Sequence, residues 1–93
     1  MNREKKKQYE KDIRKIKTQI EKSEETISQL EKEVKQTDEM LVNPETYKSV
    51  LADKEFYANY EKLKRQLENE LRNWEQLQSE LEKKEKEFSQ DMD

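Results

Sequence analysis

Apolar residues recur along two stretches of the chain with the alternating three-and-four spacing of a heptad repeat. This spacing keeps apolar side chains on one face of a helix, where they can form a seam with a second helix. The chain's single proline, Pro44, separates the two stretches. The seam positions are Tyr9, Ile13, Ile16, Ile20, Ile27, Leu30, Val34 and Leu41 in the first stretch and Phe56, Tyr60, Leu63, Leu67, Trp74, Leu77, Leu81 and Phe88 in the second.

The pattern predicts an all-α fold, a two-helix antiparallel coiled-coil hairpin with a short helical turn at the tip. Asn43 is a good helix cap and Pro44 suits a first helical position, so residues 44–51 are expected to form that turn. Asp53 can then cap the second long helix. We expect residues 1–93 to be a single hairpin with helix 1 at about 7–41, the tip at 42–53, helix 2 at about 54–88 and a frayed end at 89–93.

An antiparallel hairpin pairs seam positions whose numbers add to a constant, and here that constant is 97. Tyr9 then meets Phe88 at the open end. Ser23, a small residue, falls opposite Trp74, the bulkiest one, and such small-against-large pairs fill a seam without voids. The register therefore agrees with the hairpin along both helices.

Two other states compete with the hairpin. A parallel dimer of one long helix would place Glu70 against Glu70 and carry Pro44 through the helix interior, at a cost of about 3 kcal/mol. Disorder is the second competitor, because 46% of the residues are charged and only 29% are hydrophobic. Random polar chains do not keep a seam in register over several heptads, so we favour the ordered hairpin.

The composition also limits the chemistry. The chain has no histidine, cysteine or glycine, the residue types that a histidine-assisted nucleophile, a usual zinc site or a phosphate-binding loop requires. We therefore expect no enzyme activity, cofactor, metal or small-molecule substrate in this domain. No apolar run reaches the roughly 20 residues of a membrane span, and the charged start lacks a secretory pattern, so we expect a cytoplasmic location and no membrane contact.

Charge is unevenly distributed along the chain. Residues 1–22 hold nine Lys or Arg against four Asp or Glu, whereas the remainder is acidic. A basic amino-terminal arm can contact phosphates, although a solvated helix face is the commoner explanation of such a charge run. We expect Glu80, Glu82, Glu85 and Glu87 to lie across the hairpin and neutralise it in part. The arm consists of Arg3, Lys5, Lys6, Lys7, Lys11, Arg14, Lys15 and Lys17.

Aromatic and basic residues also gather near the tip, a combination that can hold a nucleic-acid backbone and stack bases. Phe56 and Tyr60 are seam residues, however, and Tyr47 is placed to close over them. Tyr57 is the aromatic expected to be free, and Trp74 is expected to belong to the seam before it serves as a binding platform. The basic residues of this region are Lys48, Lys54, Lys62, Lys64 and Arg65.

Two short motifs carry a family resemblance. The first helix ends in Leu41-Val42-Asn43-Pro44-Glu45-Thr46-Tyr47, and the second contains Trp74-Glu75-Gln76-Leu77. Together they resemble the carboxy-terminal coiled-coil domain of ABC-F ATP-binding cassette proteins, particularly the Uup type. That family usually has arginine where Asn73 stands here, and Arg72 lies one position earlier.

The resemblance implies that the chain is part of a larger ABC-F protein. Two cassettes of that parent protein would bind ATP and Mg²⁺ and hydrolyse ATP, and the parent would act on ribosomes or nucleic acid. For this domain it implies nucleic-acid binding, with DNA the ligand in the Uup type.

We therefore predict a nucleic-acid-binding accessory domain that contacts DNA or ribosomal RNA through the arm, the basic residues of the tip, Tyr57 and Arg72. The alternative is a structural module for protein–protein interaction or self-association without nucleic-acid binding.

Overall fold

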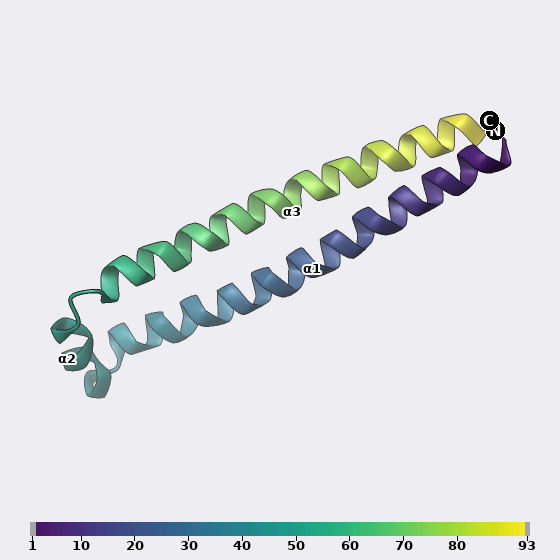
Figure 1. Ribbon diagram of the computed structural model, residues 1–93. Coiled ribbons are helices and arrows are strands. Elements are labelled where there is room, and N and C mark those ends of the chain that lie inside the picture. Colours follow the sequence, from purple (N-terminus) through teal and green to yellow (C-terminus); the bar gives the residue numbers. More distant parts are fainter. Residues whose placement is uncertain (1, 93) are drawn as a thin grey trace. The chain divides into compact units, whose positions relative to one another are not determined.

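A computed structural model describes residues 2–92, and this part of the chain forms three α-helices. They are α1 (Arg3–Val42), α2 (Pro44–Ala52) and α3 (Phe56–Met92), in chain order (Figure 1). No strand is present in the described residues. The all-α fold expected from the heptad pattern is confirmed.

Both long helices extend further than their apolar patterns. α1 begins four residues before the predicted start because Asn2 caps it: its side-chain oxygen accepts a 2.7 Å hydrogen bond from the backbone N–H of Lys5. α3 continues to Met92, so the prediction that residues 89–92 fray is wrong. Asp91 within this last turn bonds to α1, which explains the added order. Asp93 lies outside the described residues.

The short helix α2 follows the predicted capping signal. The Asn43 side chain accepts a 2.9 Å hydrogen bond from the backbone N–H of Glu45, and Pro44 occupies the first turn. The Thr46 hydroxyl donates a 2.8 Å bond back to the carbonyl of Met40 in α1. On the inner face of α2, Val50 is 2% exposed. The tip helix is therefore held at its start by hydrogen bonds and along one side by apolar burial.

A tight turn separates α2 from α3. The Asp53 carboxylate accepts a 2.9 Å hydrogen bond from the N–H of Glu55, and its carbonyl accepts one of 3.3 Å from Phe56. The first backbone bond of α3 runs from the N–H of Asn59 to the carbonyl of Glu55, at 2.9 Å. Asp53 thus makes the side-chain bond expected of a helix cap and closes the turn that leads into α3.

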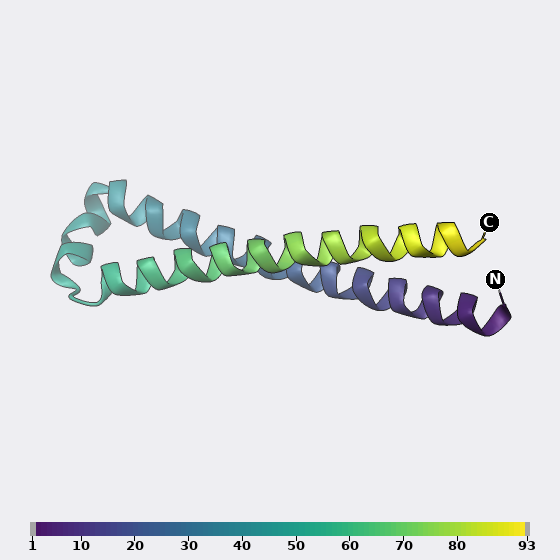
Figure 2. The ribbon, with the colours of Figure 1, turned by 90° about the horizontal axis from the view of Figure 1, so that it is seen from above.

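Residue contacts divide the chain into two units, which are described separately. Unit 1 comprises residues 1–24 and 72–93, and unit 2 comprises residues 25–71. Within unit 1, the first part of α1 and the last part of α3 run antiparallel, side by side (Figures 1 and 2). The Tyr9 and Phe88 rings meet there at 5.8 Å, the pair that the register predicts.

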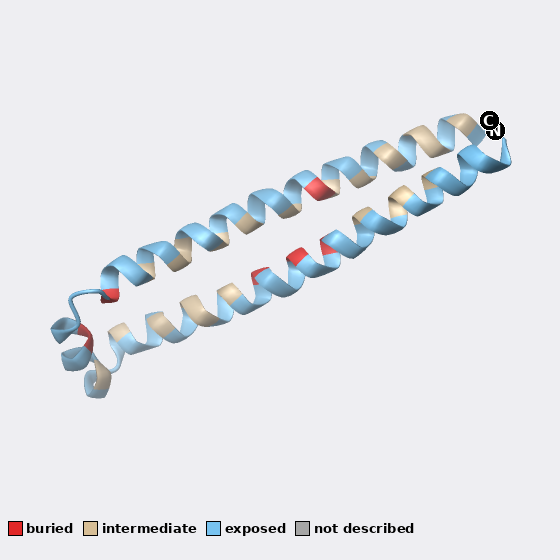
Figure 3. Ribbon diagram, viewed as in Figure 1, coloured by how far each residue is buried: buried red, intermediate tan, exposed pale blue. Residues whose placement is uncertain are grey.

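Burial follows the seam in each unit (Figure 3). In unit 1 the described buried residues are Ile20, Leu77 and Ser23, at 7%, 8% and 3% exposure. In unit 2 they are Ile27, Phe56 and Val50. Most other seam positions are half-buried, because two helices shield only one stripe of each other. No helix of the described residues is long and apolar enough to cross a membrane.

Candidate nucleic-acid interface

All eight residues of the basic arm lie on α1 in unit 1, and all are exposed. Helical spacing separates them into two groups. Lys5 and Lys15 fall on the side of α1 that carries Asp12. The other six share the opposite side and are called the basic face below: Arg3, Lys6, Lys7, Lys11, Arg14 and Lys17.

Lys5 is already engaged within unit 1. Its ammonium group lies 2.8 Å from the Asp91 carboxylate, and the Tyr9 hydroxyl donates a 2.7 Å hydrogen bond to the same carboxylate. These two donors hold the pKa of Asp91 below its usual value. The hydrogen bond with Asp91 raises the pKa of Lys5 and that of Tyr9. Lys5 is therefore part of the contact between α1 and α3, and less available to a phosphate.

Lys15 lies beside a second set of charges. It lines an open groove of unit 1 together with Asp12, Glu80, Lys83 and Lys84. Lys84 crosses to α1, with its ammonium 3.4 Å from Asp12 and 5.0 Å from the centre of the Tyr9 ring. This side of unit 1 thus mixes both signs of charge, which makes it a weak anion site.

The basic face differs from the surroundings of Lys5 and of Lys15. Within residues 2–92, none of its six cations forms an ion pair with an acidic side chain. Arg3, Lys7, Arg14 and Lys17 recur at helical spacing, and Glu10 is the one acidic residue in that row. Free, exposed cations on one helix face are what a phosphate backbone requires.

An open groove adjoins the basic face. Arg14 and Lys17 line it with Glu10 and with the apolar side chains of Ile13 and Phe88. Phe88 belongs to α3, so the groove has one wall from each helix of unit 1. Cations beside an apolar surface suit a ligand with both phosphates and ring systems.

Of the four α3 glutamates expected to lie across the hairpin from the arm, Glu80 and Glu87 line the groove that contains Lys15. Glu87 also pairs with Lys84 at 3.7 Å. Glu82 and Glu85 form no ion pair within residues 2–92. The acid that does bind the arm is Asp91, which we placed in a frayed end and therefore missed. The numbers of Lys5 and Asp91 add to 96, one short of the register constant of 97, so the register places the two residues at nearly the same level.

The basic residues of the tip are more dispersed. Lys48 lies on α2 and Lys54 in the turn after it, while Lys62, Lys64 and Arg65 lie on α3 of unit 2. Lys64 is occupied, because its ammonium lies 3.0 Å from Glu61 and 4.3 Å from the centre of the Tyr60 ring. Arg72 is exposed at the start of the α3 segment of unit 1, away from the arm. No continuous basic face forms at the tip.

The tip aromatics pack differently from the prediction. The Phe56 ring contacts Tyr57 edge-on at 5.5 Å and stacks with Tyr60 at 6.3 Å, whereas Tyr47 is 43% exposed and makes no ring contact with them. Tyr57 is 52% exposed but not free, since its ring contacts that of Phe56. Trp74 is half-buried at the seam, with its indole N–H enclosed. Tyr57 is thus more exposed than Trp74.

In unit 1, the segments of α1 and α3 form an antiparallel helix pair with a cationic face on α1. No group of three or more acidic residues that could hold a metal ion occurs in residues 2–92. No family model matches the chain, and neither the curated proteins nor the solved structures that were compared contain a match.

Proposed function

We propose that this domain binds nucleic acid, DNA or ribosomal RNA, through the basic face of α1. The supporting observation is the six exposed cations that no acidic side chain of the described residues pairs. Such a face neutralises phosphates and releases counterions without reading base sequence. In this proposal the domain is a binding module and not an enzyme, and it works in the cytoplasm.

The parent protein is part of the same proposal. The two motifs around Asn43 and Trp74 support a carboxy-terminal domain of a Uup-type ABC-F protein, in which ATP and Mg²⁺ belong to cassettes outside these residues. The first motif has a structural role here, since it forms the end of α1 and the capped start of α2. Sequencing the reading frame that contains this chain tests the assignment. A frame without two nucleotide-binding cassettes refutes the ABC-F parent and leaves the binding proposal standing.

The binding proposal is tested by fluorescence anisotropy with labelled single-stranded DNA, duplex DNA and an RNA hairpin, at several salt concentrations. We expect binding that weakens steeply as salt rises. Replacing Lys7, Lys11, Arg14 and Lys17 with glutamine removes four cations of the basic face. The plot of log affinity against log salt should then become shallower, with the magnitude of its slope smaller by about 3. Lys5 is left in place because it pairs with Asp91.

A matched control removes the same charge elsewhere. Lys32, Lys35, Lys83 and Lys86 are also exposed and form no ion pair within residues 2–92. Changing these four to glutamine should leave most of the affinity and most of the salt slope. Equal losses in both variants would show that net charge alone drives binding, and would refute the basic face as the site. No binding at low salt would refute nucleic-acid binding altogether.

A further inference from the structure

The seam of unit 2 has two unlike sides. On one side the Tyr60 hydroxyl donates a hydrogen bond to the Asp38 carboxylate, which joins α3 to α1. Lys64 lies over the Tyr60 ring on that side, 4.3 Å from its centre. This hydrogen bond raises the pKa of Tyr60. The Tyr60–Asp38 bridge therefore joins the two helices of unit 2 through polar groups that already have partners.

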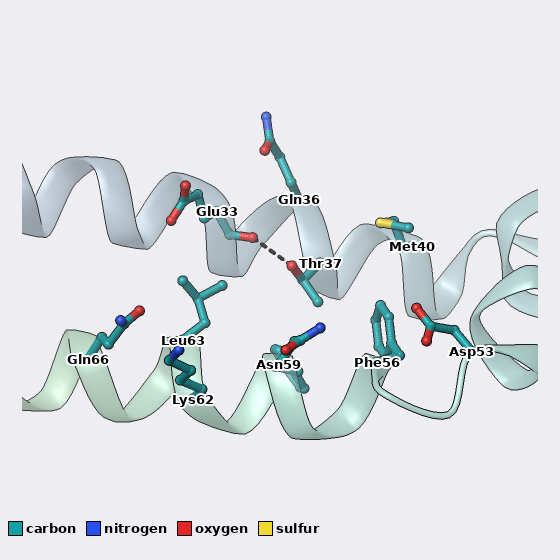
Figure 4. A pocket seen from close by; sticks show the side chains of 11 residues that line it. Glu33, Gln36, Thr37, Met40, Asp53, Phe56, Asn59, Lys62, Leu63 and Gln66 are labelled. Carbon is teal, nitrogen blue, oxygen red and sulfur yellow. Dashed lines mark hydrogen bonds between the residues drawn. The ribbon is translucent and has the colours of Figure 1, made fainter.

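The other side is an open groove of about 490 Å³ between α1 and α3 (Figure 4). Its floor is formed by the seam residues Phe56 and Leu63 and by Thr37, whose hydroxyl donates a 2.8 Å bond to the carbonyl of Glu33. Met40 borders the groove and is 40% exposed. Tyr60 also lines this groove, so apolar and aromatic seam surface is accessible on this side.

The two rims of this groove carry opposite charges, and Asp53 adds a second carboxylate at the tip end of the groove. Glu33 lies on the α1 rim and Lys62 on the α3 rim. The two do not form an ion pair with each other, and the Glu33 carboxylate accepts one long hydrogen bond, 3.5 Å from Gln29. Their numbers add to 95, so the antiparallel register places them at nearly the same level along the groove.

We infer that this groove is a homodimer interface, occupied by the same groove of a second copy of the chain. A twofold axis running along the groove exchanges the α1 and α3 rims. It brings Glu33 against the partner's Lys62, and Lys62 against the partner's Glu33. The twofold axis therefore creates two equivalent pairs, each between Glu33 of one copy and Lys62 of the other. The four long helices of the two copies enclose the apolar floors, as in a four-helix bundle.

Three amide side chains that line the groove suit the same occupant. Gln36 on α1 and Asn59 and Gln66 on α3 carry amides that both donate and accept hydrogen bonds. Such groups are self-complementary, whereas a rim of one charge would repel its own copy. The packing also removes Met40 and the floor from water, which supplies the attractive free energy.

The experiment is sedimentation equilibrium of the full 93-residue chain across concentrations up to about 1 mM, the weak end of specific association. We expect a reversible monomer–dimer equilibrium. Glu33→Lys places like charges across both rims and should weaken the dimer about tenfold, as should Lys62→Glu. The double variant Glu33→Lys with Lys62→Glu restores opposite charges and should recover most of the affinity.

Glu39→Lys is the control, because Glu39 is exposed on α1, does not line the groove and changes the charge equally. It should leave the dimer unchanged. Circular dichroism of each variant separates dissociation from unfolding. A chain that stays monomeric at the highest concentration overturns the inference. So does a dimer that responds equally to Glu33→Lys and Glu39→Lys, or a double variant that associates no better than the single ones, since either result places the contact elsewhere.

Discussion

The rings of Tyr9 on α1 and Phe88 on α3 meet edge to face, with centroids 5.8 Å apart and planes at 78°. This is the preferred geometry of an aromatic pair, because the positive edge of one ring faces the negative face of the other. The pair also fixes the register of unit 1.

Replacing Phe88 with alanine should therefore destabilise unit 1. The variant loses the aromatic pair and leaves part of the seam exposed, and because Phe88 is half-buried we expect a cost of about 2 kcal/mol in unfolding free energy. Urea denaturation followed by circular dichroism measures it. Phe88→Leu keeps an apolar side chain and should lose less. A Phe88→Leu variant as stable as the unchanged chain would show that the ring geometry contributes nothing.

The Asp91 site predicts a dependence of stability on pH. Because Lys5 and Tyr9 hold the pKa of folded Asp91 below its usual value, the ionised carboxylate stabilises the fold at neutral pH. That stabilisation should be lost as the pH falls through this lowered pKa, below about 4. At alkaline pH it should be lost again as Lys5 and Tyr9, whose pKa values are raised, deprotonate.

Thermal unfolding at several pH values, compared between the chain and Asp91→Asn, isolates this contribution. The chain should unfold at a higher temperature than the variant near neutral pH, and the two curves should converge at acid pH. A difference that persists unchanged below pH about 3 would show that the charge of Asp91 is not the cause.

Because Asn43 caps α2, its mutation should lower the stability of the fold. Asn43→Ala removes the hydrogen bond to the N–H of Glu45 and should cost about 1 kcal/mol of stability. Asn43→Asp keeps a capping oxygen and should retain most of it. Thermal unfolding of the three chains gives the comparison. An aspartate variant as unstable as the alanine variant would mean that capping is not the role of Asn43.

Ser23 tests the small-against-large packing of unit 1. It is 3% exposed, and by the register it lies opposite Trp74, the chain's single tryptophan. Ser23→Leu adds volume to a filled position and should destabilise the fold by about 1–3 kcal/mol. The intrinsic fluorescence of Trp74 should shift as the indole moves. A Ser23→Leu variant with unchanged unfolding free energy and unchanged fluorescence would show that position 23 is not packed against Trp74.

Several features could be predicted from sequence because they depend on local pattern. Heptad spacing predicted the two long helices and the contact between Tyr9 and Phe88. The Asn43-Pro44 step predicted α2. The ends of the long helices were predicted less well. The extension of α3 through Asp91 depends on bonds to Lys5 and Tyr9, which lie at the far end of the sequence.

The sequence by itself determined the helical state, the seam and its register, since periodic burial specifies which face of each helix is apolar. Only the tertiary structure decided which flanking side chains pair. It paired Lys5 with Asp91, which sets Lys5 apart from the basic face. It also placed the Phe56 ring against Tyr57, whereas we expected Tyr47 there, and joined Tyr60 to Asp38 by a hydrogen bond. The physical reason is that periodicity specifies the direction of a side chain from its own helix. Its partner depends on the distance and rotamers of the helix beside it.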